Sequence, residues 1–225
     1  MTNIGFFGLF VILNSCVALA VQGSGKILLL GRTLQHKPYY ALPLGLAAFL
    51  VGIMGQSVLV HGYSLMTGTP LQFVPWIVLG MAAATGQTFA KYVAIRSGSS
   101  GLTEDAAWLV GLNVGLGFSL AEILYLGITQ FPGVLPPAMV WSTVERLGAS
   151  VFDLASGLWV VGFIKTRRFK MLGLVWAFQT SVDGVGAVVR QHAIYVPVFE
   201  LSQTLGAFIL FATAIIFGRT WQLKR

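Results

Sequence analysis

The sequence from Ser142 to Asp183 reads STVERLGASVFDLASGLWVVGFIKTRRFKMLGLVWAFQTSVD. It contains two apolar runs joined by the basic segment KTRRFK at 165–170. A membrane helix needs about 20 mostly apolar residues. The first run has that length, and the second reaches it by continuing beyond Asp183 to about residue 190. Each run also carries charged or amide side chains, which are unfavourable inside a bilayer unless they find partners. The stretch therefore predicts two antiparallel membrane helices with a polar site between them.

The whole chain has the composition of a polytopic membrane protein. Of its 225 residues, 56% are hydrophobic and 9% are charged, and its mean hydropathy is +0.81. Soluble domains contain roughly 25% charged residues. The net charge of +7 does not indicate nucleic-acid binding, because the basic residues gather at helix ends. It is better interpreted as a topology signal and as attraction to anionic lipid.

Seven runs of the chain have the length and composition of a membrane helix. Short connections rich in Gly, Pro and Ser separate them, so we expect consecutive helices to be antiparallel neighbours. The single cysteine, Cys16, can form no internal disulfide. We expect one all-α transmembrane domain over residues 1–225, with seven helices at approximately 4–31, 41–66, 71–96, 104–130, 137–165, 168–190 and 193–219.

Connections that carry basic residues alternate along the chain with connections that carry none. The second and fourth connections carry none, and the sixth is the exception to the pattern with Arg190 and His192. Basic loops tend to stay in the cytoplasm, so the pattern predicts an N-terminus outside and a C-terminus inside. The residues that carry this prediction are Arg32, Lys37, Arg96, Lys165, Arg167, Arg168, Lys170, Arg219, Lys224 and Arg225.

The helix at 104–130 contains a regular series of small residues. Gly111, Gly115 and Ser119 recur at fourfold spacing, which is typical of a tight seam between two membrane helices. Glu122 follows three residues later. A lone carboxylate at that depth has to face protein, water or a cation, so Glu122 is a candidate site residue.

The helices at 137–165 and 168–190 carry further polar side chains. Arg146 and Asp153 are seven residues apart and share one helical face, while Glu145 points about 100° away from that face. Gln179 and Asp183 are four residues apart and share a face of the next helix. We expect four of the side chains to lie at one level, between mid-membrane and the outer half: Glu122, Asp153, Gln179 and Asp183.

The helix at 71–96 adds Gln87, Thr88 and Lys91, followed by Tyr92. Gln87 is expected near mid-membrane. Lys91 is close enough to the cytoplasmic end for its long side chain to reach the interface, so we expect an interfacial lysine when this helix is considered alone.

Together these segments resemble the YhfC family of intramembrane metalloproteases, relatives of the CAAX-prenyl protease and PrsW group. That family carries Glu-Glu-x-x-Arg-Tyr, then Gly-x-Gly-His-Gly-x-x-Glu, then Glu-Arg with a histidine seven residues on, then His-x-x-x-Asp. The corresponding segments of this chain begin at Gln87, Gly115, Glu145 and Gln179. The resemblance spans roughly residues 70–190 and implies a prokaryotic cytoplasmic membrane.

The departures from the family pattern fall on the reactive positions. Gln87 and Thr88 replace the paired glutamates, and neither can take a proton from water at neutral pH. The family histidines correspond to Phe118, Asp153 and Gln179, and a phenyl ring cannot ligate a metal. These degenerate positions imply that the catalytic chemistry has been lost while the helical frame has been kept.

Two interpretations of the site follow. In the first, Lys91, Glu122, Glu145, Arg146, Asp153, Gln179 and Asp183 form a buried polar network that sets helix register. Arg146 would then pair with Asp153 or Glu145, and Gln179 would bridge to Glu122 or Asp183. In the second, Glu122, Asp153, Gln179 and Asp183 converge on a divalent cation, since carboxylate and amide oxygens suit hard metal ions. Otherwise we expect no cofactor.

Three functions are consistent with the sequence. The favoured one is a catalytically silent, intramembrane-metalloprotease-like protein that acts as a binding or scaffold subunit of a membrane complex. Its partners would be the lipid bilayer and another membrane protein or transmembrane segment, and not nucleic acid. The alternatives are an active metal-dependent intramembrane protease with altered ligands and a small ion-coupled transporter. The lack of an inverted repeat argues against the transporter.

Overall fold

The computed structural model describes residues 3–30, 38–130, 136–189 and 192–223. These residues form seven α-helices and two short 3₁₀ turns, and they contain no β-strand. The α-helices are α1 (Asn3–Leu30), α2 (Ala41–Thr67), α3 (Trp76–Gly98), α4 (Glu104–Gln130), α5 (Pro136–Thr166), α6 (Lys170–Val189) and α7 (Val196–Leu223), and the 3₁₀ turns are η1 (Leu71–Phe73) and η3 (Ala193–Tyr195).

Six of these helices, all except α3, are long and apolar enough to cross a membrane. The chain is therefore an all-α integral membrane protein, as its composition predicts. The helix α3 is less apolar because Gln87, Lys91 and Arg96 interrupt it. It nevertheless packs closely between α2 and α6, which are its main neighbours in the bundle.

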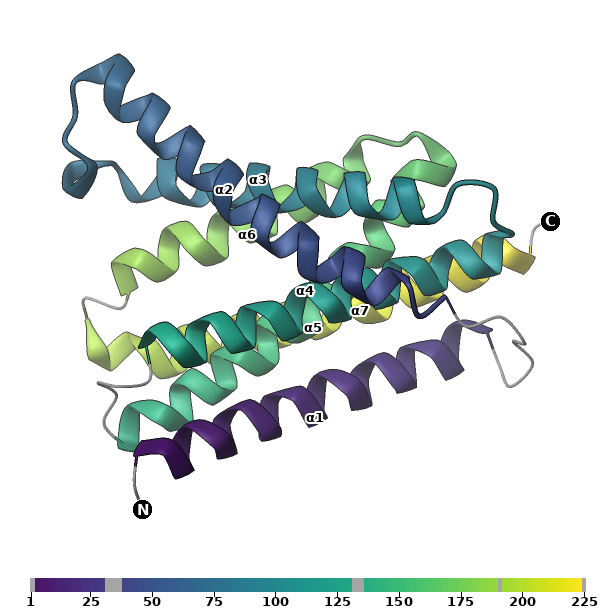
Figure 1. Ribbon diagram of the computed structural model, residues 1–225, viewed down its shortest axis with the longest axis horizontal. Helices are drawn as coiled ribbons and strands as arrows, with labels where there is room; N and C mark the ends of the chain where they lie inside the picture. Colours follow the sequence, from purple (N-terminus) through teal and green to yellow (C-terminus); the bar gives the residue numbers. More distant parts are fainter. Residues whose placement is uncertain (1–2, 31–37, 131–135, 190–191, 224–225) are drawn as a thin grey trace.

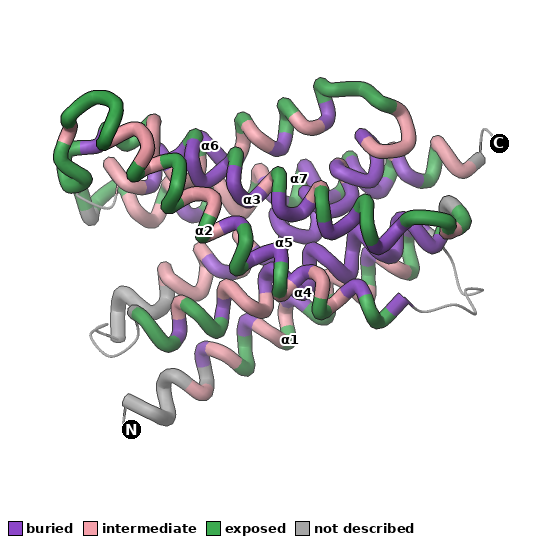
Figure 2. Tube along the Cα trace, turned by 45° about the horizontal axis from the view of Figure 1, so that its top comes forward, coloured by how far each residue is buried: buried purple, intermediate pink, exposed green. Residues whose placement is uncertain are grey.

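The helices form two groups that meet along α4 (Figure 1). One group consists of α2, α3 and α6, and the other of α1, α4, α5 and α7. The helices α4 and α5 form the centre, since 67% and 78% of their apolar windows are buried, against 17–28% for the other four candidate membrane spans. Figure 2 shows the same distribution, with the buried residues concentrated along these two helices.

The small residues of α4 form the predicted seam, and α5 is the helix that packs against it. A Cβ atom added at Gly115 would lie 2.5 Å from the carbonyl oxygen of Asp153 and 2.8 Å from Cα of Leu154. Gly111 approaches the backbone of Gly157 in the same way. Ser119 donates a hydrogen bond of 2.8 Å to Ser150 Oγ. The prediction of a tight seam is confirmed, because backbones this close leave no room for side chains.

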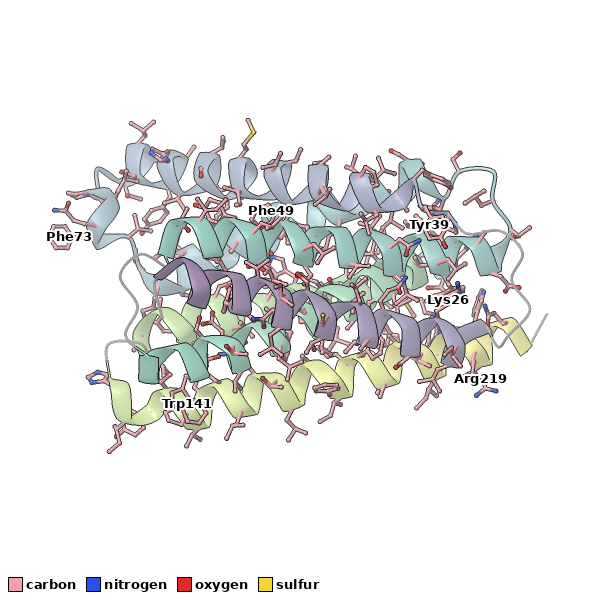
Figure 3. All side chains as sticks on the ribbon, turned by 60° about the horizontal axis from the view of Figure 1, so that its bottom comes forward. Lys26, Tyr39, Phe49, Phe73, Trp141 and Arg219 are labelled. Atoms are coloured by element: carbon pink, nitrogen blue, oxygen red, sulfur yellow. The ribbon has the colours of Figure 1, made fainter. Side chains whose placement is uncertain are left out.

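Basic side chains gather at one end of the bundle. Figure 3 shows Lys26, Tyr39 and Arg219 at this end, and Phe73 and Trp141 at the opposite end. The basic end also holds the α3–α4 and α5–α6 connections, because successive helices run antiparallel (Figure 1). We call the two ends the basic end and the apolar end.

Three predicted helix boundaries differ from the structure by more than two residues: the start of the third helix and both ends of the seventh. The third helix begins at Trp76 and not at 71, because the chain first makes the turn η1 and Pro75 then occupies the N-cap, where it needs no hydrogen-bond donor. The seventh helix begins at Val196 after η3, with Pro197 in its first turn, and extends to Leu223. The other boundaries agree within two residues, including the start of the sixth helix at Lys170, which follows a left-handed φ of 59° at Arg167 that separates α5 from α6.

Candidate functional site

A polar cavity of about 150 Å³ lies among α3, α4, α5, α6 and α7. Glu122, Asp153, Gln179 and Asp183, the four side chains predicted to share one level, all line it. Glu122 is eight residues before the end of α4 at Gln130, which places it about 12 Å from the apolar end along the helix. The remaining lining residues are Gln87, Leu126, Glu145, Arg146, Gly148, Ala149, Phe152, Phe178, Val182 and Gln203.

Lys91 and Asp153 form a buried ion pair at one side of this cavity. Lys91 Nζ lies 2.6 Å from Asp153 Oδ1 and donates a second hydrogen bond of 2.9 Å to Ser156 Oγ. Lys91 is 1% exposed, so the prediction of an interfacial lysine is wrong. The ammonium group turns inward because the carboxylate of Asp153 and the ring of Phe118, whose centroid is 4.1 Å away, solvate it inside the bundle.

Arg146 pairs with two glutamates and not with Asp153. Its Nη2 donates a hydrogen bond of 2.5 Å to Glu145 Oε1, and its Nη1 lies 3.2 Å from Glu122 Oε1. The shared helical face with Asp153 does not produce a pair, because Lys91 reaches Asp153 from α3. Glu145 thus finds its partner in the adjacent residue of its own helix, while Arg146 connects α5 to α4.

Gln179 bridges to Asp183 within α6, one of the two arrangements that the spacing allows. Its Nε2 donates a hydrogen bond of 2.7 Å to Asp183 Oδ2. Gln179 is buried, and Asp183 is partly buried. All seven members of the predicted polar network therefore lie in or against one cavity, although their pairing differs in part from the prediction.

One buried polar atom at the cavity lacks a hydrogen-bond partner within the described part of the chain. It is Asp153 Oδ2. Asp153 is 3% exposed. A buried oxygen without a partner is destabilising by about 1–3 kcal/mol, so this atom has unused capacity to bind a ligand or water.

The degenerate positions of the family pattern lie in different surroundings. Gln87 is buried and lines the cavity. Phe118 is fully buried and packs over Lys91. Thr88 faces a separate groove on the other side of α3. Of these three, only Gln87 lines the cavity, where it joins Asp153 and Gln179, the residues at the other two histidine positions.

A second hollow of about 430 Å³ adjoins the cavity and shares Gln87, Glu122 and Asp183 with it. It lies among α2, α3, α4 and α6 and reaches Leu79 in the first turn of α3 and Ala187 in the last turn of α6. Both turns are at the apolar end, so this hollow, which we call the vestibule, leads from that end toward the polar cavity.

Sequence reasoning missed several residues of the site and a second polar cluster. Phe152 and Phe178 line the cavity, but apolar aromatic residues in membrane helices carry no signal that would single them out. Elsewhere, Gln22 Nε2 donates a hydrogen bond of 2.8 Å to Asn113 Oδ1. Asn113 Nδ2 in turn donates one of 3.0 Å to the carbonyl oxygen of Pro38, which joins α1, α4 and the α1–α2 connection.

No three His, Cys, Asp or Glu side chains of the described segments are placed to hold a metal ion together. Of the predicted metal ligands, Asp153 is paired with the ammonium of Lys91, and Asp183 accepts a hydrogen bond from Gln179.

Arg190, whose charge bears on the topology prediction, lies outside the described residues.

Comparisons with protein-family models, with curated proteins and with solved structures found no match for this chain. The resemblance to the YhfC family therefore stays a prediction. The cavity and its side chains carry the functional argument.

Proposed function

We propose that this protein is a catalytically silent, metalloprotease-like membrane protein that works by binding, as a subunit of a membrane complex. Its polar cavity receives a positively charged side chain of a partner membrane protein, and the vestibule is the route by which that group enters. The observation that carries the proposal is the buried, unpartnered Asp153 Oδ2 in a polar cavity that connects to the vestibule.

The charges at the cavity favour a cationic ligand. Within the described ranges, the lining contains four carboxylates but a single guanidinium, that of Arg146. Lys91 adds one positive charge beside the cavity. A lysine or arginine side chain from a partner would bring a positive charge that offsets this excess of carboxylates. Carboxylates at membrane depth typically pair with such groups.

The alternative of an altered metalloprotease has weaker support from the same residues. Gln87 and Phe118 stand at the positions of the family's general base and of one histidine, and neither side chain can activate water. Asp153 Oδ1 is held by Lys91, so of that carboxylate only Oδ2 would be left for a metal ion.

The test of this proposal is partner capture by matched variants. Affinity-tagged wild-type protein in mild detergent should retain a stoichiometric membrane partner. Glu122→Gln should weaken that retention at least about tenfold, since removing one member of a buried charge pair costs about 2–5 kcal/mol of binding energy. Quantitative mass spectrometry of the eluates measures the ratio.

The matched control is Asp105→Asn, another carboxylate-to-amide change on α4. Asp105 is exposed and accepts a hydrogen bond from Gln222, far along the helix from the cavity. The Asp105→Asn variant should retain the partner as well as the wild type does. Equal retention by Glu122→Gln and wild type, or release of a cleaved peptide by the wild type, would rule the proposal out.

We further propose that all seven helices cross the membrane, with the basic end in the cytoplasm of a prokaryote and the N-terminus outside. The distribution of basic residues supports this orientation. Burial supports the crossing of α3, because the polar side chains of Gln87 and Lys91 face the bundle and not lipid. The vestibule would then open toward the outside.

The crossing of α3 can be measured with single cysteines on its two flanks. In a Cys16→Ser background, we expect Gln72→Cys to react with a membrane-impermeant maleimide added to intact cells. Ser100→Cys should react only after permeabilisation. Both positions are exposed, so labelling reports the side of the membrane. Labelling of both cysteines from the same side would show that α3 does not cross.

A further inference from the structure

A large apolar groove lies on the outer surface of α3, away from the polar cavity. It has a volume of about 690 Å³ and lies among α3, the end of α5 and the start of α6. The last turns of α3 and α5 and the first turn of α6 are all at the basic end (Figure 1). The groove thus runs along the bundle toward the charged end of the protein.

Aromatic side chains form the walls of the groove. Phe89 and Phe169 are 62% and 76% exposed, so their rings are presented to the surroundings and do not fill the core. The ring centroids of Phe163 and Phe169 are 5.1 Å apart, and those of Tyr92 and Phe163 are 5.8 Å apart. These contacts hold the rings in place as a continuous apolar surface.

A hydrogen bond fixes the spacing of the two helices that border the groove. Trp176 Nε1 of α6 donates to Thr85 Oγ1 of α3 at 3.0 Å. Both residues line the groove at the end farther from the charged loop. The groove is therefore a formed feature of the helix packing, and its lining is mainly apolar.

Arginines stand at the mouth of the groove. Arg167 lines it, is exposed, and has a left-handed φ of 59°; its backbone N–H donates a hydrogen bond of 2.7 Å to the carbonyl oxygen of Phe163. This turn directs the chain across the end of the groove. Arg96 Nη1 donates to Tyr92 Oη at 2.9 Å, which places a second guanidinium beside the groove. Neither arginine forms an ion pair within the described residues.

We propose that this groove is a binding site for one anionic phospholipid. The acyl chain lies along the aromatic walls, and the phosphate binds the guanidinium of Arg167 with support from Arg96. Guanidinium groups match phosphate oxygens in two-point hydrogen bonds, and basic pockets between membrane helices bind anionic head groups. The site is separate from the polar cavity, so this inference does not depend on the proposed partner.

The experiment is lipid retention by the delipidated full-length protein, measured by native mass spectrometry after addition of phosphatidylglycerol or phosphatidylcholine. We expect wild type to retain one phosphatidylglycerol molecule in preference to phosphatidylcholine. Arg167→Gln should weaken the retention of phosphatidylglycerol about tenfold, the effect of losing charged hydrogen bonds to a phosphate. Phe169→Ala should weaken retention of both lipids, because it removes apolar wall.

The control is Arg219→Gln, which removes an exposed charge from the same end of the bundle but outside the groove. It should bind phosphatidylglycerol like wild type. Arg167 and Phe169 are exposed, so neither change is expected to prevent folding, and a melting curve for each variant verifies this. Equal retention of the two lipids by wild type, or equal effects of Arg167→Gln and Arg219→Gln, would overturn the proposal. So would unaltered binding in Phe169→Ala.

Discussion

Replacing Lys91 by methionine is expected to lower the free energy of unfolding by about 3–5 kcal/mol, the effect of removing one partner from a buried ion pair. Methionine retains much of the apolar stem of lysine but has no ammonium group. Asp153 would keep its carboxylate at 3% exposure without the contact of 2.6 Å that now neutralises it. Unfolding in mild detergent, driven by temperature or by added SDS, measures the loss.

A matched variant separates the ion pair from general effects of charge removal. Lys26→Met removes a partly exposed lysine of α1 and should change stability by no more than about 0.5 kcal/mol. The double variant Lys91→Met with Asp153→Leu should recover most of the stability, because an apolar pair of similar size replaces a buried ion pair without a large penalty. A loss below about 1 kcal/mol in Lys91→Met would contradict the proposed role of the pair.

Replacing Gly115 by alanine is expected to destabilise the protein by about 1–3 kcal/mol, because the added methyl group overpacks the α4–α5 seam. Its Cβ would lie 2.5 Å from the carbonyl oxygen of Asp153 and 2.8 Å from Cα of Leu154. Both are backbone atoms, so the neighbouring helix must move as a unit. The same movement would shift Asp153 relative to Lys91. A reduced midpoint of unfolding in detergent is the expected readout.

The control for this change is Gly62→Ala in α2. No heavy atom lies within 4 Å of a Cβ atom at Gly62, so there is nothing for the methyl group to displace. Alanine has a higher helix propensity than glycine, and the variant should be as stable as wild type or more stable by up to about 1 kcal/mol. Equal stability of Gly115→Ala and Gly62→Ala would mean that the seam is looser than described.

The helical architecture was predictable because its signals are local. Length and hydropathy identify membrane helices, and Gly111, Gly115 and Ser119 mark one face of α4 as a seam. The sequence could not say that α5 is the partner in this seam, since that depends on how the two helices rotate about their axes. The start of α3 was also mispredicted, because the apolar residues of η1 resemble a helix until the effect of Pro75 is taken into account.

The candidate site was predictable as a group of residues but not as a set of pairs. A buried charge must have a partner, so the polar residues at membrane depth were expected to meet. Which charged side chains pair depends on how far each one extends toward the neighbouring helices. Lys91 lies near the end of α3 and could extend toward either the interface or the core, and only the position of Asp153 on α5 decides between these directions.

The polar cluster of Gln22 and Asn113 had no predictive signal at all. Single amides in apolar helices are common, and Asn113 has no charged or amide neighbour at helical spacing in α4. They meet because α1 packs along α4, a long-range contact that spacing within one helix cannot reveal.

The central claim is that the polar cavity binds a cationic group of a partner, and the native mass spectrum of the purified protein tests it most directly. The account predicts a species that exceeds the 24.2 kDa chain by the mass of one membrane partner. This species should be lost in Glu122→Gln and kept in Asp105→Asn. A wild-type spectrum that shows only the bare chain, or one that Glu122→Gln leaves unchanged, would contradict the claim.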